Sequence, residues 1–135
     1  MHPIDFYQNL LTPLLPGLLG IRLTEVDPQR VVAELFVRPD LCTVGGILHG
    51  GAYMAFADTL GAIGTIVNLP EGSRTTTTDS STKFIGPAKV HTTVIGQCTA
   101  IHRGRTTMVW QTAIRSAEGK ICALVTQTQL VLNAS

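Results

Sequence analysis

The stretch GGILHGGAYMAFADTLGAIGTIV, residues 45–67, decides the fold. From Gly51 onward its side chains are apolar on almost every face, and a helix without a polar face is typical of a buried helix. One charged residue, Asp58, interrupts this run. An unpaired buried carboxylate is costly, so sequences seldom keep one without a functional reason. The stretch therefore predicts a central buried helix that carries a candidate catalytic acid.

A glycine-rich turn leads into this helix. Paired glycines at 45–46 and 50–51 flank His49, and they allow the backbone to approach a ligand closely. The free N–H groups and the positive dipole end of the helix follow, and together they suit an oxyanion. Asp58 comes nine residues after His49, which places the two about half a turn apart around the axis. A homodimer with a composite site is therefore the simplest arrangement in which both serve one reaction.

Length and composition predict a single globular domain over residues 1–135. The chain is 44% hydrophobic and 14% charged, which supports a core of its own and excludes a disordered chain. A net charge of +1 excludes an extended basic surface, so nucleic acid is not an expected partner. Low charge and positive mean hydropathy favour extra surface buried between subunits.

The cysteines and the N-terminus bear on the cellular compartment. Cys42, Cys98 and Cys122 show no C-x-x-C spacing, so neither a disulfide framework nor a zinc site is expected. An apolar stretch at 10–21 is interrupted by Pro13, Pro16 and Gly17, and no basic residues precede it. It fits neither a signal peptide nor a membrane span. We expect a cytoplasmic protein with reduced thiols.

Strands surround the predicted helix in the chain. A short helix over residues 3–12 ends at Pro13, and alternation of apolar and polar residues marks the strands. The expected strands cover residues 21–26, 31–38, 75–84, 89–102, 106–116 and 121–132. Most are joined by short glycine-containing or proline-containing turns, which favour antiparallel hairpins. The predicted fold class is α+β, an antiparallel sheet of about six strands wrapped around one long buried helix.

This order of elements resembles the hotdog fold, and more narrowly the acyl-CoA thioesterases of the phenylacetic-acid-degradation type, which are related to the hydroxybenzoyl-CoA thioesterases. The resemblance covers nearly the whole chain. Its motif is G-x-x-H-G-G followed by an acid, here Gly46, His49, Gly50, Gly51 and Asp58, with FIGPA at 84–88 and HRGR at 102–105.

The resemblance implies a mechanism. Asp58 is expected to act as nucleophile or general base, and the Gly50 N–H is expected to polarise the thioester carbonyl from the partner subunit. His49 helps to shape the pocket. The physics agrees, because one preorganised oxyanion donor is worth about 3 kcal/mol and a poorly solvated carboxylate is a better base than one in water. No cofactor and no metal are expected, and helical phase disfavours a metal shared by His49 and Asp58.

The resemblance also implies where CoA binds. Residues expected to line the substrate path are Thr43, Gly51, Ser81, Thr82, Lys83 and Phe84. Arg103 and Arg105 are expected to meet the phosphates, since guanidinium groups match phosphate geometry. An Arg-Gly-Arg turn is also a common solvated hairpin tip, and this alternative stays open.

Two positions depart from the family pattern. Thr43 stands six residues before the histidine, where relatives often carry Asn or Gln, and Ala62 stands four residues after the acid, where some carry Ser or Thr. The group that positions water is therefore open, with Thr43 and Thr65 as candidates.

The expected activity is hydrolysis of an acyl-CoA to a free acid and CoA by a homodimer or tetramer. Whether the acyl group is aromatic or medium-chain aliphatic stays open. Two alternatives are a hydratase or dehydratase on the same fold, and a non-catalytic module that binds acyl-CoA or an acyl carrier. In the second alternative Asp58 is a structural acid of the dimer interface.

Overall fold

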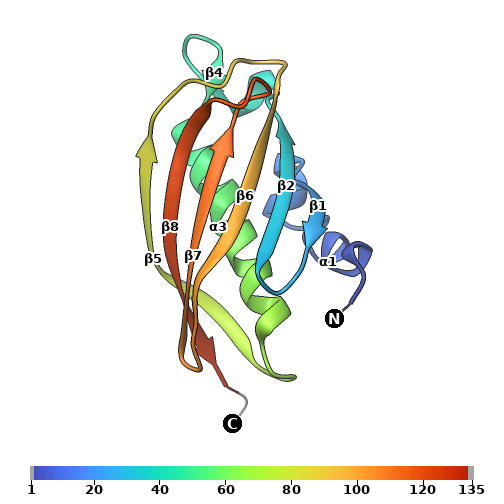
Figure 1. Cartoon of the computed structure of the whole chain (residues 1–135). Helices are drawn as coiled ribbons and strands as arrows, with labels where there is room; N and C mark the ends of the chain where they lie inside the picture. The colour runs from blue at the N-terminus through green and yellow to red at the C-terminus, as the bar shows by residue number, and fades with distance from the viewer. Residues whose placement is uncertain (1, 134–135) are drawn as a thin grey trace.

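A six-stranded antiparallel sheet wraps around one long helix, and the predicted α+β hotdog fold is confirmed (Figure 1). The computed structural model describes residues 2–133. The helix is α3 (Gly50–Asn68). The strands, in the order in which they lie in the sheet, are β1 (Arg22–Val26), β2 (Arg30–Phe36), β6 (Thr93–Arg103), β7 (Thr107–Arg115), β8 (Ile121–Leu132) and β5 (Arg74–Phe84). Strand β5 therefore forms one edge of the sheet.

Smaller elements complete the fold. They are α1 (Ile4–Leu11), α2 (Leu15–Leu19), the 3₁₀ turn η1 (Pro39–Leu41) and a short hairpin of β3 (Cys42–Thr43) and β4 (Ile47–Leu48). Only α1 follows from the sequence pattern. Helix α2 is a single short turn that contains a proline and a glycine, so periodicity cannot reveal it. A Cβ at Gly17 would lie 1.8 Å from the carbonyl oxygen of Thr12, which explains the glycine at this tight corner.

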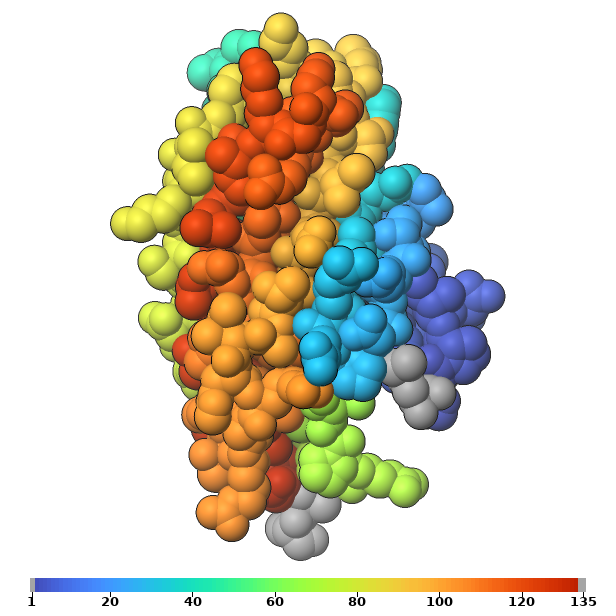
Figure 2. All heavy atoms as spheres, in the orientation of Figure 1, coloured from blue at the N-terminus to red at the C-terminus, as the bar shows by residue number. Residues whose placement is uncertain are grey.

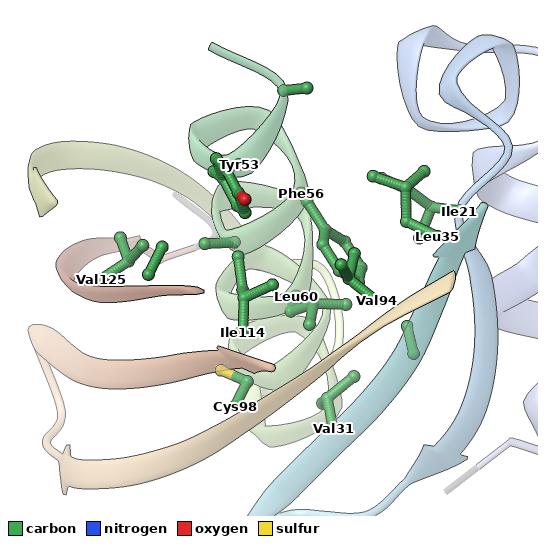
Figure 3. Packing of buried hydrophobic residues seen from close by; sticks show 14 of the residues in the cluster. Ile21, Val31, Leu35, Tyr53, Phe56, Leu60, Val94, Cys98, Ile114 and Val125 are labelled. Atoms are coloured by element: carbon green, nitrogen blue, oxygen red, sulfur yellow. The ribbon is translucent and has the colours of Figure 1, made fainter. Parts of the chain in front are cut away.

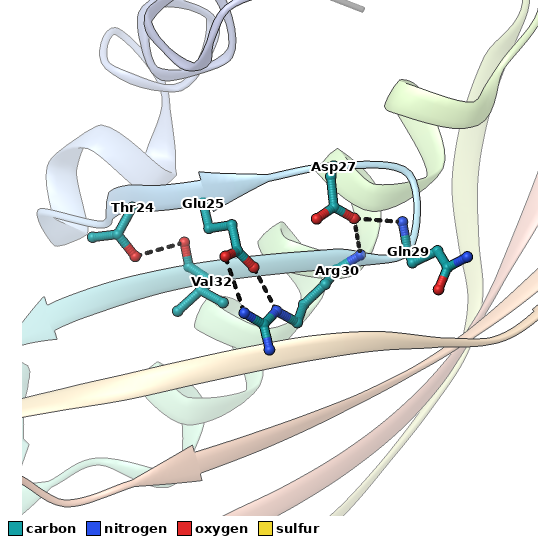
Figure 4. Close-up of polar contacts among 6 residues, drawn as sticks. All are labelled: Thr24, Glu25, Asp27, Gln29, Arg30 and Val32. Carbon is teal, nitrogen blue, oxygen red and sulfur yellow. Dashed lines mark hydrogen bonds and ion pairs between the residues drawn. The ribbon is translucent and has the colours of Figure 1, made fainter.

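A polar turn joins β1 to β2, as the sequence predicts (Figure 4). The Asp27 carboxylate accepts hydrogen bonds from the backbone N–H groups of Gln29 and Arg30, at 2.8 and 2.9 Å. The Arg30 guanidinium in turn pairs with Glu25 across the hairpin. A carboxylate that binds the backbone two and three residues on is the usual way in which Asp forms a turn.

Large side chains from α3 form the centre of the core. Phe56 and Leu60 are fully buried, and they project from the helix over strand residues such as Val94 (Figure 3). These side chains pack directly against the backbone of β6, because β6 has a glycine, Gly96, at the point of contact. A Cβ at Gly96 would lie 2.9 Å from Leu60 and 3.0 Å from Phe56, so this position requires glycine.

A second close contact lies near the C-terminal end of α3. The ring of Trp110 packs under Gly64, where a Cβ would meet it at 2.9 Å. Its indole N–H donates to the Thr65 hydroxyl at 2.9 Å, and that hydroxyl donates to the carbonyl oxygen of Gly61, also at 2.9 Å. Both side chains are fully buried with their polar atoms paired, so they fix the helix against β7.

In a single chain, α3 is covered on one side only. The sheet covers one side of the helix, and Met54 and Ile66 on the other side are 40% and 38% exposed. Asp58 is half-buried on the flank that faces β5. One curved sheet can cover only one side of a helix, so the apolar outer side remains available to a second subunit.

Candidate active site

The N-terminal end of α3 presents an unused N–H group. His49 is the N-cap residue, and its Nδ1 accepts a hydrogen bond from the Gly51 N–H at 2.8 Å. Its carbonyl oxygen accepts from the Ala52 N–H at 2.9 Å. Within residues 2–133 the Gly50 N–H has no acceptor. A free N–H at the positive end of a helix is a donor for an oxyanion.

Gly50 also lines a hollow of about 400 Å³, which we call the Gly50 hollow. Its lining is mostly apolar and consists of Thr43, Ile47, Leu48, Gly50, Tyr53, Phe84, Ile85, Gly86 and Pro87. The Phe84 ring lies so close to Gly50 that a Cβ there would meet it at 3.2 Å. The rings of Phe84 and Tyr53 meet edge to face, with centroids 6.1 Å apart. The predicted residues Thr43 and Phe84 therefore lie together with Gly50.

Tyr53 contributes a neutral wall to this hollow. Burial, followed by the neighbouring Cys122 thiol, raises the pKa of Tyr53 to about 12. The phenol therefore stays protonated at neutral pH. Its hydroxyl lies 3.5 Å from the carbonyl oxygen of Gly86.

The Asp58 carboxylate is held by two strands of the sheet. Its Oδ1 accepts a hydrogen bond from the Thr77 hydroxyl of β5 at 2.6 Å and one from the Gln127 amide of β8 at 3.2 Å. Its Oδ2 has no hydrogen-bond partner within residues 2–133. The carboxylate is thus oriented through one oxygen while the other stays available.

Two buried glutamines of β8 extend the hydrogen-bond network of Asp58. Gln127 Nε2 also donates to Gln129 Oε1 at 3.1 Å, and Gln129 Nε2 donates to the Thr75 hydroxyl at 3.0 Å. The Thr77 hydroxyl lies within hydrogen-bonding distance of both Asp58 Oδ1 and Gln129 Oε1. A hydroxyl has a single proton, so these two acceptors compete for it.

Sequence reasoning missed this polar row. Gln127 and Gln129 are 0% and 1% exposed, although glutamine is mostly an exposed residue. Their spacing of two places both on the inner face of β8, and the other residues of that face are apolar. That pattern, two amides at inward positions of β8, is the signal that could have found them.

Only half of the residues predicted on β5 face the helix. Thr82 and Phe84 pair with Val125 and Ala123 of β8, which are buried under α3. Directly paired residues share a face of the sheet, so Thr82 and Phe84 face α3. Ser81 and Lys83 alternate with them and lie on the opposite face. In a single chain, neither of these two shares the site with Gly50 or Asp58.

A β-bulge explains this alternation. The register between β5 and β8 shifts between Thr77 and Asp79, so one extra residue stands in β5. As a result Thr77 and Ser80 both lie opposite buried glutamines, Gln129 and Gln127. Bulges next to active sites commonly redirect a side chain in this way.

The two predicted phosphate-binding arginines lie at the other end of the molecule. Arg103 is the last residue of β6 and Arg105 lies in the β6–β7 turn, beside the C-terminal end of α3 (Figure 1). The Arg103 guanidinium donates to the Asn68 side chain at 3.3 Å and to the Pro28 carbonyl oxygen at 3.4 Å. Arg105 is exposed. The structure does not bring them to Gly50 of the same chain, so their role stays a prediction that requires a second chain.

One of the predicted water-positioning groups is wrong. Thr65 is fully buried, and its hydroxyl is used by Trp110 and Gly61, so it does not reach Asp58. Thr43 is exposed at the rim of the Gly50 hollow. The hydroxyl that contacts Asp58 belongs to Thr77, 19 residues further along the chain.

Two kinds of feature are absent from the described residues. Residues 2–133 contain no group of three or more His, Cys, Asp or Glu side chains placed to hold a metal ion. No helix in the same range is both long and apolar enough to cross a membrane.

Comparison with known proteins gives a consistent family. Residues 45–123 match the model of the thioesterase superfamily. The chain is 30% identical to the proofreading thioesterase EntH of Klebsiella pneumoniae over 104 residues, which are 77% of this chain and 75% of that protein.

Solved structures have the same fold. A thioesterase from Haemophilus influenzae superimposes with a TM-score of 0.92 at 27% identity, over 98% of this chain and 92% of that chain. A Streptococcus mutans protein with bound acetyl-CoA superimposes with a TM-score of 0.78 at 21% identity, over 84% of this chain and 90% of that chain. At 21% identity, the likeness to the second protein shows the fold alone.

The close contact between α3 and the buried amides makes a testable prediction about Gly61. A Cβ there would lie 2.3 Å from the Gln127 side-chain amide. Gly→Ala inside a helix normally stabilises by about 1 kcal/mol, whereas overpacking costs about 1–3 kcal/mol. We expect Gly61→Ala to lower the free energy of unfolding, measured by urea denaturation, and to lower kcat because Gln127 no longer holds Asp58.

The control is the same substitution with the amide removed. In a Gln127→Ala background, Gly61→Ala should raise the free energy of unfolding, because only helix propensity remains. A stabilising effect of Gly61→Ala in the wild-type background would contradict this account of the contact.

Proposed function

This chain belongs to the thioesterase superfamily and is a thioester hydrolase, and from this premise we propose that it hydrolyses an acyl-CoA to the free acid and CoA. The observation that carries the proposal is that the same helix offers a free N–H at Gly50 and an oriented carboxylate at Asp58. A thioester needs both, a donor for the developing oxyanion and a group that attacks or activates water. The acetyl-CoA bound to the Streptococcus mutans protein supports CoA as the carrier.

The two groups act from different chains. Gly50 and Asp58 are eight residues apart on α3, which corresponds to about 12 Å along the axis. One carbonyl group cannot contact both in a single chain. A homodimer in which the second chain supplies the acid brings them together, as isologous dimers do for composite sites.

The edge strand β5 supports such a dimer. It is 11 residues long, lies at the edge of the sheet, and carries Thr77, which holds Asp58. An edge of this length offers unpaired N–H and C=O groups to a second strand. Pairing of two β5 strands places the acid beside the chain boundary, where the second α3 begins. Further pairing of dimers through the exposed side of α3 gives a tetramer.

The reaction follows from these positions. The thioester carbonyl oxygen accepts from the Gly50 N–H of one chain. Asp58 of the other chain, oriented through Oδ1 by Thr77 and Gln127, uses its free Oδ2 either to attack the carbonyl carbon or to take a proton from an attacking water. If Asp58 attacks, the C–S bond breaks to leave an anhydride between Asp58 and the acyl group, which water then hydrolyses to the free acid and the Asp58 carboxylate. If Asp58 activates water, the water oxygen bonds to the carbonyl carbon and the C–S bond breaks to give the acid directly. In both routes a proton from the water goes to the CoA thiolate.

The Gly50 hollow favours an acyl group of limited size. About 400 Å³ with aromatic walls at Tyr53 and Phe84 accommodates an aryl or a medium-chain aliphatic group. A panel of both kinds of thioester identifies the preference.

Asp58→Asn tests the role of the acid. The amide has the same shape and still accepts from Thr77, so the fold should be kept. We expect kcat, measured as release of free thiol from a panel of aryl-CoA and alkyl-CoA thioesters, to fall at least about 100-fold. An unchanged urea midpoint serves as the control for folding. If the variant keeps wild-type kcat on the preferred substrate, Asp58 is a structural acid.

Gly50→Pro tests the oxyanion donor. Proline removes the N–H yet suits the first position of a helix, and His49 already has the extended backbone, φ −64° and ψ 141°, that a residue before proline needs. We expect kcat to fall about 100-fold to 1,000-fold. Gly50→Ala is the matched control, since it adds a similar contact with Phe84 and keeps the N–H, and it should retain most activity. Equal losses in both variants would mean that packing, and not the N–H, is responsible.

Mixing the two inactive variants tests the composite site. In a heterodimer of Asp58→Asn and Gly50→Pro chains, one of the two sites receives both intact groups. Random coexpression should therefore restore about a quarter of wild-type activity, with half of the dimers mixed and one site active in each. If each chain held a complete site, the mixture would be as inactive as its components.

A further inference from the structure

A second hollow, of about 310 Å³, adjoins the Gly50 hollow, and the two share Gly86 and Pro87. We call it the lysine groove. It is lined by Gly86, Pro87, Lys89, Thr92, Ser116, Glu118, Lys120, Ile121 and Cys122. The Gly50 hollow is apolar, whereas the lysine groove is bordered by ammonium, hydroxyl and carboxylate groups. A ligand that extends from one to the other therefore has an apolar end and a charged end.

Lys89 is fixed near the start of α3 by the backbone. The Leu48 N–H donates to the Ala88 carbonyl oxygen at 2.8 Å, and the Val90 N–H donates to the Gly46 carbonyl oxygen at 2.9 Å. The segment that carries Lys89 thus pairs with the residues directly before His49 and Gly50. The Lys89 side chain is exposed and lines the lysine groove.

Lys120 comes from the β7–β8 turn. The Ser116 N–H donates to the Lys120 carbonyl oxygen at 2.8 Å, and the Arg115 guanidinium donates to the Gly119 carbonyl oxygen at 3.2 Å, so the turn is well fixed. This turn and the loop over residues 85–92 lie at the same end of the sheet, next to each other, in both Figure 1 and Figure 2.

The charges of the groove are only partly neutralised. Within residues 2–133 neither Lys89 nor Lys120 forms an ion pair. The pKa of Glu118 is lowered chiefly by a hydrogen bond from its own backbone N–H and one from Ser116, and additionally by the charges of Lys120 and Lys89. Both ammonium groups therefore act on the same small region. Two cations and one anion leave a positive excess there.

We propose that the lysine groove binds the phosphate end of a phosphopantetheine thioester, whose arm runs past Gly86 and Pro87 to place the thioester at Gly50. This inference rests on the proposed function and specifies how its substrate is held. A phosphate carries up to two negative charges and matches the excess of the groove. The pantetheine arm is uncharged and fits the shared, largely apolar wall. CoA and an acylated carrier protein both have this phosphate.

The groove offers a phosphate site within the chain that holds Gly50, whereas the arginines near the β6–β7 turn would need a second chain. Arg103 and Arg105 lie beyond the C-terminal end of α3, whereas Lys89 and Lys120 lie at the N-terminal end with the Gly50 N–H. The two assignments make opposite predictions for paired variants.

The test compares one acyl group on three carriers: CoA, phosphopantetheine and pantetheine. For Lys89→Ala/Lys120→Ala we expect KM to rise about tenfold for the two phosphorylated carriers, with kcat unchanged and the pantetheine thioester unaffected. Lys89→Arg/Lys120→Arg keeps both charges and should retain wild-type KM. Added salt should raise KM for acyl-CoA in the wild type and have little effect in the alanine variant.

Four results would overturn the proposal: equal KM changes with and without phosphate, no change for any carrier, a selective loss only in Arg103→Ala/Arg105→Ala, or a KM rise confined to CoA. The last result would assign the lysines to the nucleotide phosphates. A KM rise shared by CoA and phosphopantetheine supports the proposal, and acylated carrier protein then becomes a substrate to compare by kcat/KM.

Binding separates this inference from the proposed function. If the wild type releases no thiol from any thioester, the proposed hydrolysis fails, and calorimetry with CoA and with pantetheine still tests the groove. A Kd for CoA that is about tenfold weaker in the lysine variant supports it, and an unchanged Kd rejects it.

Discussion

The close approach of α3 to the sheet is the constraint on which the rest of the structure depends. At three points the contact has no room for a Cβ, at Gly61 over the Gln127 amide, at Gly64 over Trp110, and at Gly96 under Phe56 and Leu60. Two of these glycines lie on the helix and one on the sheet, so both surfaces contribute. Glycine inside a helix costs about 1 kcal/mol relative to alanine. Such costs are accepted where they allow large side chains to fill the space between two elements.

This approach is also what connects the core to the chemistry. Because α3 packs closely against β8, Asp58 can accept a hydrogen bond from the Gln127 amide. Because α3 also packs closely against β5, the same carboxylate accepts one from Thr77. Buried glutamines are costly unless they are paired, and most of the polar atoms in this row are paired with one another or with Asp58. A larger distance between α3 and the sheet would break these hydrogen bonds and leave buried amides without partners. The orientation of the acid and the stability of the core are therefore set by the same contact.

Particular residues show how far the sequence alone leads. The apolar run of α3, the lone acid within it and the glycines around His49 are local features, and they predicted the helix and its N-terminal turn. The hotdog fold was expected from the family resemblance that these residues and the order of elements carry. Which β5 residues face the helix was harder to predict. Side chains alternate between the two faces of a strand, and one extra residue at the bulge reverses the alternation, so Thr82 and Phe84 face the helix whereas Ser81 and Lys83 do not. The partner of Asp58 was missed for a related reason. Thr65 is closer in sequence, but Thr77 reaches the acid only through strand pairing, which depends on the whole sheet.

The proposed division of the candidate site between two chains follows from the same geometry. A helix offers an oxyanion donor only at its first turn, whereas an acid can be supported by neighbouring strands only where the helix crosses them, here about 12 Å further along. A single helix thus separates the two groups by more than the size of a thioester. Two copies related by a two-fold axis can bring the start of one helix beside the middle of the other, provided that the acid lies near the edge at which the copies meet. Asp58 meets this condition because its hydroxyl partner, Thr77, belongs to the edge strand β5.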